Sequence, residues 1–188
     1  GIIAATENSS NAINNEESFA TIINNGTISS NGSHAIHNNT SAAITSLTNT
    51  GTISGGDYGI NNTGAIGYIS NTGTISAGNN IGIYNHGGTI TTLDNYQSTL
   101  TYKGVLPTNY NAIINSPSDY GKITFSDVSG TTNFGVHSSS ILTEATYNSV
   151  ISGITSGDIA SGTSGKHSNP NACNDVSMTI TIDISYSN

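Results

Sequence analysis

Aliphatic residues flanked by polar ones recur along the first half of the chain with a period of 22 to 25 residues. Three of them fall in each period. They are Ile13, Ile36, Ile60 and Ile83, then Ile22, Leu47, Ile69 and Leu93, then Ile28, Ile53, Ile75 and Leu100. Because side chains alternate between the two faces of a strand, we expect each aliphatic to point inward and its neighbours outward. On this register Ile60 faces the core and Asn61 faces solvent.

Asparagine follows the first two aliphatic sets at a constant offset of two residues, which gives two columns. They are Asn15, Asn38, Asn62 and Asn85, and Asn24, Asn49, Asn71 and Asn95. An asparagine at an inward-facing corner can bond the amide of the next coil and the backbone beside it. We therefore interpret both columns as structural ladders and not as ligand sites.

A fixed period in this range is typical of a stacked solenoid. Three strand-like segments per period, without a helical pattern, predict an all-β protein, a parallel β-helix with three-strand coils of 22–25 residues. The phrase Gly-Thr-Ile-Ser begins at Gly26, Gly51 and Gly73. Glycine at such a corner permits positive φ and close approach between coils.

The repeat loosens after Leu100, and we expect the β-helix to occupy residues 1–155. Residues 156–188 are predicted to be a loop rich in Gly, Ser and Asn followed by a strand from Val176 to Tyr186, where apolar and polar residues alternate. That strand either caps its own chain or pairs with a neighbouring one.

The net charge of the chain limits the classes of partner that it can bind. The net charge is -8, and Lys103, Lys122 and Lys166 are the only basic residues. Binding of nucleic acid or of an anionic membrane surface needs basic clusters, so both are disfavoured. No apolar run approaches the roughly 20 residues of a transmembrane helix. The composition suits an extracellular or bacterial cell-surface protein, and the opening at Gly1 without a signal peptide fits a processed form.

Candidate catalytic and metal-binding residues are few. The eleven acidic residues do not recur at the coil period, so the pattern predicts neither a catalytic acid pair nor a cofactor or metal site. His34 and His37, three apart on a strand, should face opposite sides and make no joint site. Cys173 is the single cysteine, which excludes an internal disulfide. We expect an inert thiol, with an intermolecular disulfide as the alternative in a secreted protein.

Hydroxyl residues flank the third aliphatic set on the outward face, which makes it a candidate binding face. They are Thr27, Ser29, Thr52, Ser54, Thr74, Ser76, Thr99 and Thr101. Stacked coils would place them in two columns with rows about 4.8 Å apart. Such a flat array could bind ordered water, as on ice, or glycans. The simpler interpretation is that Thr and Ser are good solvent-facing strand residues.

Three stretches carry a resemblance to a known family. They run from Leu100 to Asn115, from Ser118 to Ile123 and from Tyr147 to Ile154. These stretches and the repeats before them resemble bacterial autotransporter passenger domains, right-handed parallel β-helices exported to the cell surface. The similarity covers about residues 11–160. Within residues 1–188 we expect no translocator barrel, and the tail from Lys166 departs from the usual passenger end.

From these features we expect a non-enzymatic, extracellular structural or adhesive protein that self-associates head-to-tail into filaments. The alternative is a binding module that uses the Thr/Ser face for ice or glycans, and an enzyme acting on polysaccharide comes third. The expected partners are further copies of the chain and surface glycans.

Overall fold

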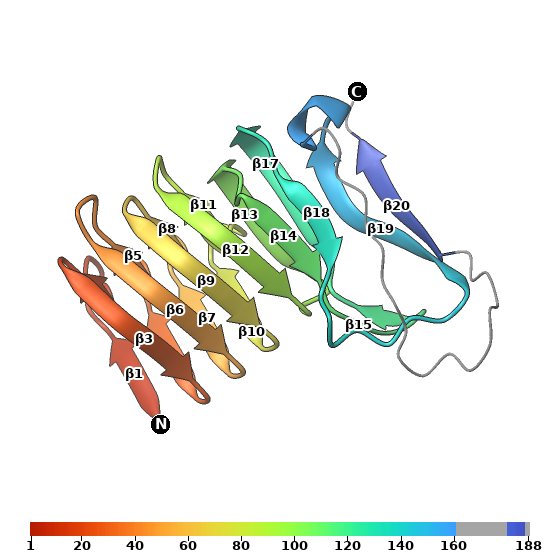
Figure 1. Ribbon diagram of the computed structural model, residues 1–188. Helices are drawn as coiled ribbons and strands as arrows, with labels where there is room; N and C mark the ends of the chain where they lie inside the picture. Colours follow the sequence, from red (N-terminus) through yellow and green to blue (C-terminus); the bar gives the residue numbers. More distant parts are fainter. Residues whose placement is uncertain (161–179, 187–188) are drawn as a thin grey trace.

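The computed structural model describes residues 1–160 and 180–186, which form a stack of short parallel strands (Figure 1). Sheet A contains β1 (Ile2–Ala5), β4 (Thr27–Ser30), β7 (Thr52–Gly55) and β10 (Thr74–Ala77). Sheet B contains β2 (Ile13–Asn15), β5 (Ile36–Asn38), β8 (Ile60–Asn62), β11 (Ile83–Asn85), β13 (Leu100–Val105), β17 (Ile123–Ser129), β19 (Ala145–Ile154) and β20 (Ile180–Tyr186). Sheet C contains β3 (Ser18–Asn24), β6 (Ala43–Asn49), β9 (Ala65–Asn71), β12 (Thr89–Asn95), β14 (Asn109–Ala112) and β18 (Asn133–Val136). The predicted parallel β-helix is confirmed.

Pairing between coils follows the predicted register through β12. Ile36 lies between Ile13 and Ile60, and Leu47 lies between Ile22 and Ile69. The inward aliphatics from the second coil onward are buried in one continuous core. A single coil buries too little apolar surface to offset the entropy of ordering its backbone, so stacking is what stabilises the fold.

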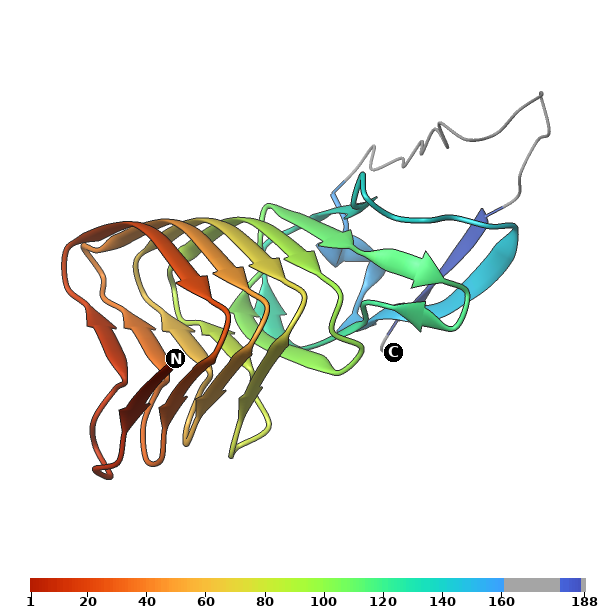
Figure 2. The same cartoon turned by 90° about the horizontal axis from the view of Figure 1, so that it is seen from below.

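The first coil leaves this core open at one end of the stack (Figure 2). Ile3 and Phe19 occupy inward positions, matched to Ile28 and Ile44 in the next coil. They are nevertheless 48% and 40% exposed, whereas their partners are 2% and 1% exposed. The end of the β-helix near the N-terminus is therefore an uncovered apolar surface bordered by the strand edges of β1, β2 and β3.

Sheet A ends at β10, which corrects the register expected for Leu100. Leu100 begins β13 and pairs with Ile123 in sheet B, so it does not stack on Ile75. The side chain of Gln97 covers the vacated edge instead. Its Oε1 accepts from the Ile75 N–H at 2.8 Å, and its Nε2 donates to the Ile75 carbonyl at 3.1 Å. One side-chain amide thus supplies both hydrogen bonds that a further strand would make there.

The corner glycines show close approach without positive φ. A Cβ on Gly51 would lie 2.1 Å from the Gly26 carbonyl oxygen, and one on Gly73 would lie 2.1 Å from that of Gly51. Neither glycine has positive φ. Of the two reasons expected for glycine, only the steric one applies at these corners.

The chain beyond β14 is less regular. β15 (Ile114–Ser116) and β16 (Asp119–Tyr120) form an antiparallel hairpin, and η1 (Ser156–Asp158) is a single 3-10 turn. β20 adds to β19 of the same chain in parallel and extends sheet B. Residues 161–179, which include Lys166, Cys173 and the first part of the strand predicted from Val176, lie outside the described residues.

Candidate binding surface

The predicted hydroxyl columns form three rows on the outer face of sheet A. Thr27, Thr52 and Thr74 align across β4, β7 and β10, and so do Ser29, Ser54 and Ser76. β1 would continue the columns but contributes Ile2 and Ala4. The array is therefore two residues wide and three coils long.

Thr99 and Thr101 do not belong to this array, contrary to the sequence-based expectation. Thr101 pairs with Thr124 in sheet B, and its hydroxyl accepts from the Gly82 N–H at 2.8 Å. Thr99 is exposed and receives a 3.3 Å hydrogen bond from Gln97 Nε2. Sheet A ends at β10, and the chain continues into sheet B at β13, so no fourth row of hydroxyl residues forms.

A continuous group of five rings lies on the outer face of sheet B and on the turns next to its strands, and we call it the aromatic patch. Ring centroids are 5.3 Å apart for His37–His34, 5.3 Å for His34–Tyr58, 4.8 Å for Tyr58–Tyr84 and 4.7 Å for Tyr84–His86. Parallel strand pairing places these residues on three successive coils. His34 and Tyr58 each stand two residues before the buried aliphatic of their coil, His37 and Tyr84 each stand one residue after it, and His86 stands alone, so the rings come from three columns.

The contact between His34 and His37 contradicts the expectation that they face opposite sides. β5 begins at Ile36, so His34 lies in the turn before the strand and does not follow its alternation. His37 aligns with Asn14 and Asn61 on the outward side, as expected. Asn61, however, is only 8% exposed and donates from Nδ2 towards His34 Nε2 at 3.0 Å. It is not a free surface residue.

The patch carries little net charge at neutral pH. Burial lowers the pKa of His34, with a further lowering from His37 and a smaller opposing effect of Asp57. Burial also lowers the pKa of His37. The Lys103 ammonium lies 5.7 Å from the Tyr84 ring centroid and pairs with Asp127 at 2.9 Å. His34 and His37 are thus neutral at neutral pH, and the Lys103 cation beside Tyr84 is compensated by Asp127.

Two tyrosines of the patch keep their hydroxyls free of intramolecular hydrogen bonds. Tyr68, Tyr96, Tyr102, Tyr120 and Tyr147 all donate to protein oxygens. In the described part of the chain, no such bond is made by the hydroxyl of Tyr58 or Tyr84, and neither oxygen is buried without a partner. These two phenols face solvent and are available to a ligand.

Two polar atoms within the patch are buried without partners, namely His34 Nδ1 and Asn61 Oδ1. Since His34 Nε2 accepts from Asn61, the neutral ring carries its proton on Nδ1. One orphan is therefore a donor and the other an acceptor. Each costs about 1–3 kcal/mol when left unsatisfied, which is unusual outside functional or hydrated sites.

The asparagine ladders hold the coils in register beneath this surface. In the first ladder each Nδ2 donates to the next Oδ1, at 2.7, 2.7 and 2.8 Å from Asn15 to Asn85. In the second the distances are 2.7, 2.9 and 3.1 Å from Asn24 to Asn95. Nδ2 also donates to backbone carbonyls, such as Ala43 O from Asn15, which fixes the amide orientation. The ladders end on Val105 O and Lys122 O.

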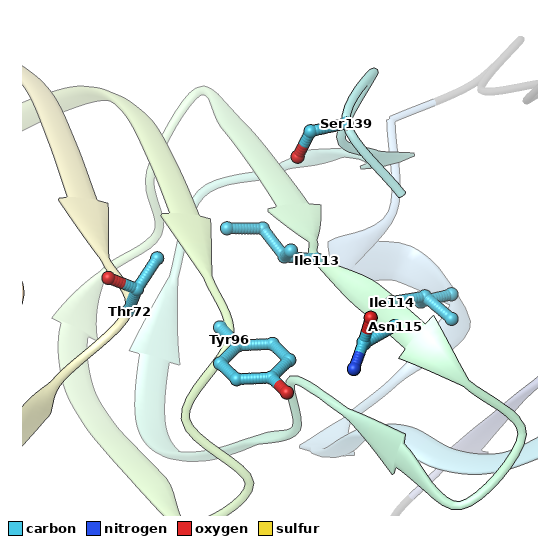
Figure 3. A pocket seen from close by; sticks show the side chains of 6 residues that line it. All are labelled: Thr72, Tyr96, Ile113, Ile114, Asn115 and Ser139. Carbon is cyan, nitrogen blue, oxygen red and sulfur yellow. The ribbon is translucent and has the colours of Figure 1, made fainter. Parts of the chain in front are cut away.

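An open depression of about 350 Å³ lies over the junction of the regular coils and the hairpin. It is lined by Thr72, Tyr96, Ile113, Ile114, Asn115 and Ser139 (Figure 3). Tyr96 and Asn115 lie side by side in Figure 3, and both donate to the Asp119 carboxylate. These contacts already engage the polar groups at the floor of the depression.

Ser139 at the rim of this depression belongs to a Ser–His–Asp chain. His137 Nδ1 lies 2.7 Å from Ser139 Oγ, and His137 Nε2 lies 3.3 Å from Asp94 Oδ2. Acyl transfer also needs donors aimed at the developing oxyanion. The nearby Asn115 amide is committed to Asp119, and the Ser139 N–H bonds the same His137 Nδ1. The geometry therefore fits a structural contact, in which His137 holds the turn that contains Ser139 against Asp94 of sheet C, better than a catalytic centre.

Searches against protein-family models, curated proteins and solved structures find no match to this chain. In residues 1–160 and 180–186 no helix has the length and apolarity needed to cross a membrane. Within the same residues no group of three or more His, Cys, Asp or Glu side chains is placed to hold a metal ion. The aromatic patch combines a continuous row of rings with two tyrosine hydroxyls that are free of intramolecular hydrogen bonds in the described chain.

The patch was not predicted from the sequence because its rings do not repeat on every coil and come from three columns: His34 with Tyr58, His37 with Tyr84, and His86 alone. The register alone indicates that Tyr58 and Tyr84 are close in space, because Tyr84 pairs with Asn61 of the preceding coil and Tyr58 stands three residues before Asn61. A search for rings on diagonals between coils would have found the pair.

Proposed function

We propose that this chain is a non-enzymatic structural and adhesive protein of the extracellular space or bacterial cell surface, built like an autotransporter passenger domain. The aromatic patch is the observation that carries the adhesive role. Solvent-facing aromatic rings with free polar tips are characteristic of recognition surfaces, since they offer large contact area at a low entropic cost. The ladder-locked coils make this surface rigid before any partner binds.

A bead assay tests the adhesive role. Beads coated with the purified chain should be retained on bacterial or host cell layers under flow more strongly than beads coated with the heat-unfolded chain. Replacing Tyr58 and Tyr84 together by Ala should reduce retention to that background. Equal retention of folded and unfolded coatings would refute the adhesive function.

Self-association into filaments is the second proposed role, and the open first coil favours it. Ile2, Ile3, Phe19 and Ile23 are all exposed at that end, and the outer edge of β1 has no partner strand in the described chain. Exposed strand edges with apolar side chains recruit further strands. A second copy can cover this surface.

Sedimentation velocity and electron microscopy test the assembly. Phe19→Glu should abolish concentration-dependent association, whereas Ile141→Glu, at an exposed residue away from the first coil, should not. Deletion of residues 176–188 tests whether the C-terminal strand takes part in the junction. A full-length chain that stays monomeric at high concentration would contradict this role.

The hydroxyl face on sheet A remains the alternative binding surface, for ice or for glycans. Its three rows give a small array, so we place it behind the aromatic patch. Thermal hysteresis of the intact chain, compared with Thr52→Val, tests ice binding directly.

A further inference from the structure

We propose that the aromatic patch binds uncharged polysaccharide chains, whose sugar rings lie along Tyr58 and Tyr84. The inference rests on the proposed adhesive function and names the chemical class of the partner. Shape, hydrogen-bonding capacity and charge of the patch each support it.

The shape of the patch suits an extended ligand. Its five rings form an unbroken path over three coils, with successive centroids 4.7 to 5.3 Å apart. His37 and Tyr84 lie on the paired strands of sheet B, and His34, Tyr58 and His86 lie in the turns next to these strands, so the path follows the in-register coils of the β-helix. A compact ligand would contact two rings at most, whereas a linear chain of sugars can contact all of them. Apolar faces of sugar rings pack on aromatic side chains in the same way as other apolar groups.

The free polar atoms match a ligand that both donates and accepts hydrogen bonds. The hydroxyls of Tyr58 and Tyr84 are without intramolecular partners in the described chain, and His86 is exposed beside them. The orphan pair inside the patch, His34 Nδ1 and Asn61 Oδ1, combines a donor with an acceptor. Sugar hydroxyls, which both donate and accept, can pair with the two phenols, whereas the orphan pair is buried beneath the surface that a ligand would touch.

The charges around the patch favour an uncharged chain over an acidic one. The chain as a whole carries -8, and Lys103 is engaged by Asp127. The two histidines have lowered pKa values and stay neutral at neutral pH. An acidic polysaccharide would therefore meet repulsion from the negative chain, and Lys103, the cation beside Tyr84, is already engaged. A purely apolar protein partner would leave the free phenols unsatisfied.

The binding experiment uses the intact chain and defined oligosaccharides. Neutral hexasaccharides of β-linked glucose, xylose and N-acetylglucosamine are titrated by calorimetry, with an oligogalacturonate of equal length as the acidic comparison. We expect at least one neutral hexasaccharide to bind and the acidic one to bind more weakly. Tyr58→Ala and Tyr84→Ala should each weaken binding about tenfold, the loss of one aromatic contact.

Matched variants and a footprint locate the site. Tyr96→Ala removes a ring outside the patch, and Thr52→Ala alters the hydroxyl face; both should leave affinity unchanged. In hydroxyl-radical footprinting of the unaltered chain, the hexasaccharide should protect Tyr58 and Tyr84 but not Tyr96, a result that does not depend on any variant folding.

Three outcomes would overturn the inference: no neutral hexasaccharide binds, footprinting leaves Tyr58 and Tyr84 unprotected, or Thr52→Ala removes the binding. The retention of coated beads on cells distinguishes a failure of the sugar-binding inference from a failure of the adhesive function. Retention that persists while every sugar fails would leave adhesion standing and refute a glycan partner, with a protein surface as the remaining ligand.

Discussion

Replacing Asn62 by Ala tests whether the asparagine ladder stabilises the coils. Asn62 is 0% exposed, accepts from Asn38 Nδ2 at 2.7 Å and donates to Asn85 Oδ1 at 2.8 Å. Its Nδ2 also reaches the carbonyls of Gly64 and Thr89 at 3.2 and 3.1 Å. Asn38 is also bonded on both sides, but its Nδ2 donates to one backbone carbonyl where that of Asn62 donates to two, so Asn62 has more hydrogen-bond partners than Asn38.

The expected cost follows from what the substitution leaves behind. Asn38 Nδ2 keeps its 3.1 Å bond to Ala65 O, so it is not orphaned. Asn85 Oδ1 loses its donor in the ladder and stays buried. One unsatisfied buried acceptor costs about 1–3 kcal/mol. For a chain of this size each kcal/mol lowers Tm by about 2–4 °C, so a mid-range loss corresponds to a fall of about 4–8 °C.

The assay is thermal and urea unfolding followed by far-ultraviolet circular dichroism. Asn31→Ala is the matched control, because Asn31 is exposed and its side chain makes no hydrogen bond in the described structure. A double-mutant cycle of Asn62→Ala with Asn85→Ala should show coupling above about 0.5 kcal/mol, since the two side chains share a bond. Equal melting of the Asn62 and Asn31 variants, or strictly additive effects in the cycle, would refute the ladder as a source of stability.

Three further predictions concern the core, the sheet edge and pH. Ile60→Asp should unfold the β-helix, because an unpaired buried charge costs several kcal/mol. Thr74→Asp, at an exposed outward position, should change Tm by little. Circular dichroism distinguishes the two variants, and equal melting of both would mean that the register is wrong. Gln97→Ala should lower stability by about 1–3 kcal/mol and promote aggregation, because it exposes the edge of β10 at Ile75; unchanged melting and light scattering would contradict this. The pKa of His34 is lower in the folded chain than in the unfolded one, so the unfolded state binds protons more readily. The free energy of unfolding should therefore be highest above the usual histidine pKa of 6.5 and should fall as the pH drops through the lowered pKa. His34→Gln should flatten this fall, and an unchanged pH profile in that variant would refute His34 as the cause.

The fold was accessible from sequence because the β-helix repeats itself. One register error would move a whole set of aliphatics from core to solvent, so the pattern of Ile36, Ile60 and Ile83 allows a single alignment. The same periodicity located the ladders, since Asn38 and Asn62 must stack if the aliphatics two residues earlier do. Wherever coils are alike, neighbours in space are known from sequence spacing alone.

Tertiary structure decided what the repeat does not encode. Leu100 fits the sequence pattern of Ile75, yet the chain leaves sheet A after β10, and Gln97 ends that sheet with its side chain. Where sheet A ends depends on whether the Gln97 side-chain amide or a further strand pairs with the edge of β10, and the periodicity of the sequence does not predict this choice. The contact of Tyr58 with Tyr84 likewise joins different columns of different coils. The sequence by itself determined the repeat and its ladders because identical coils can stack in only one register, whereas the end of sheet A and the aromatic patch arise where coils differ and only the packed structure brings those differences together.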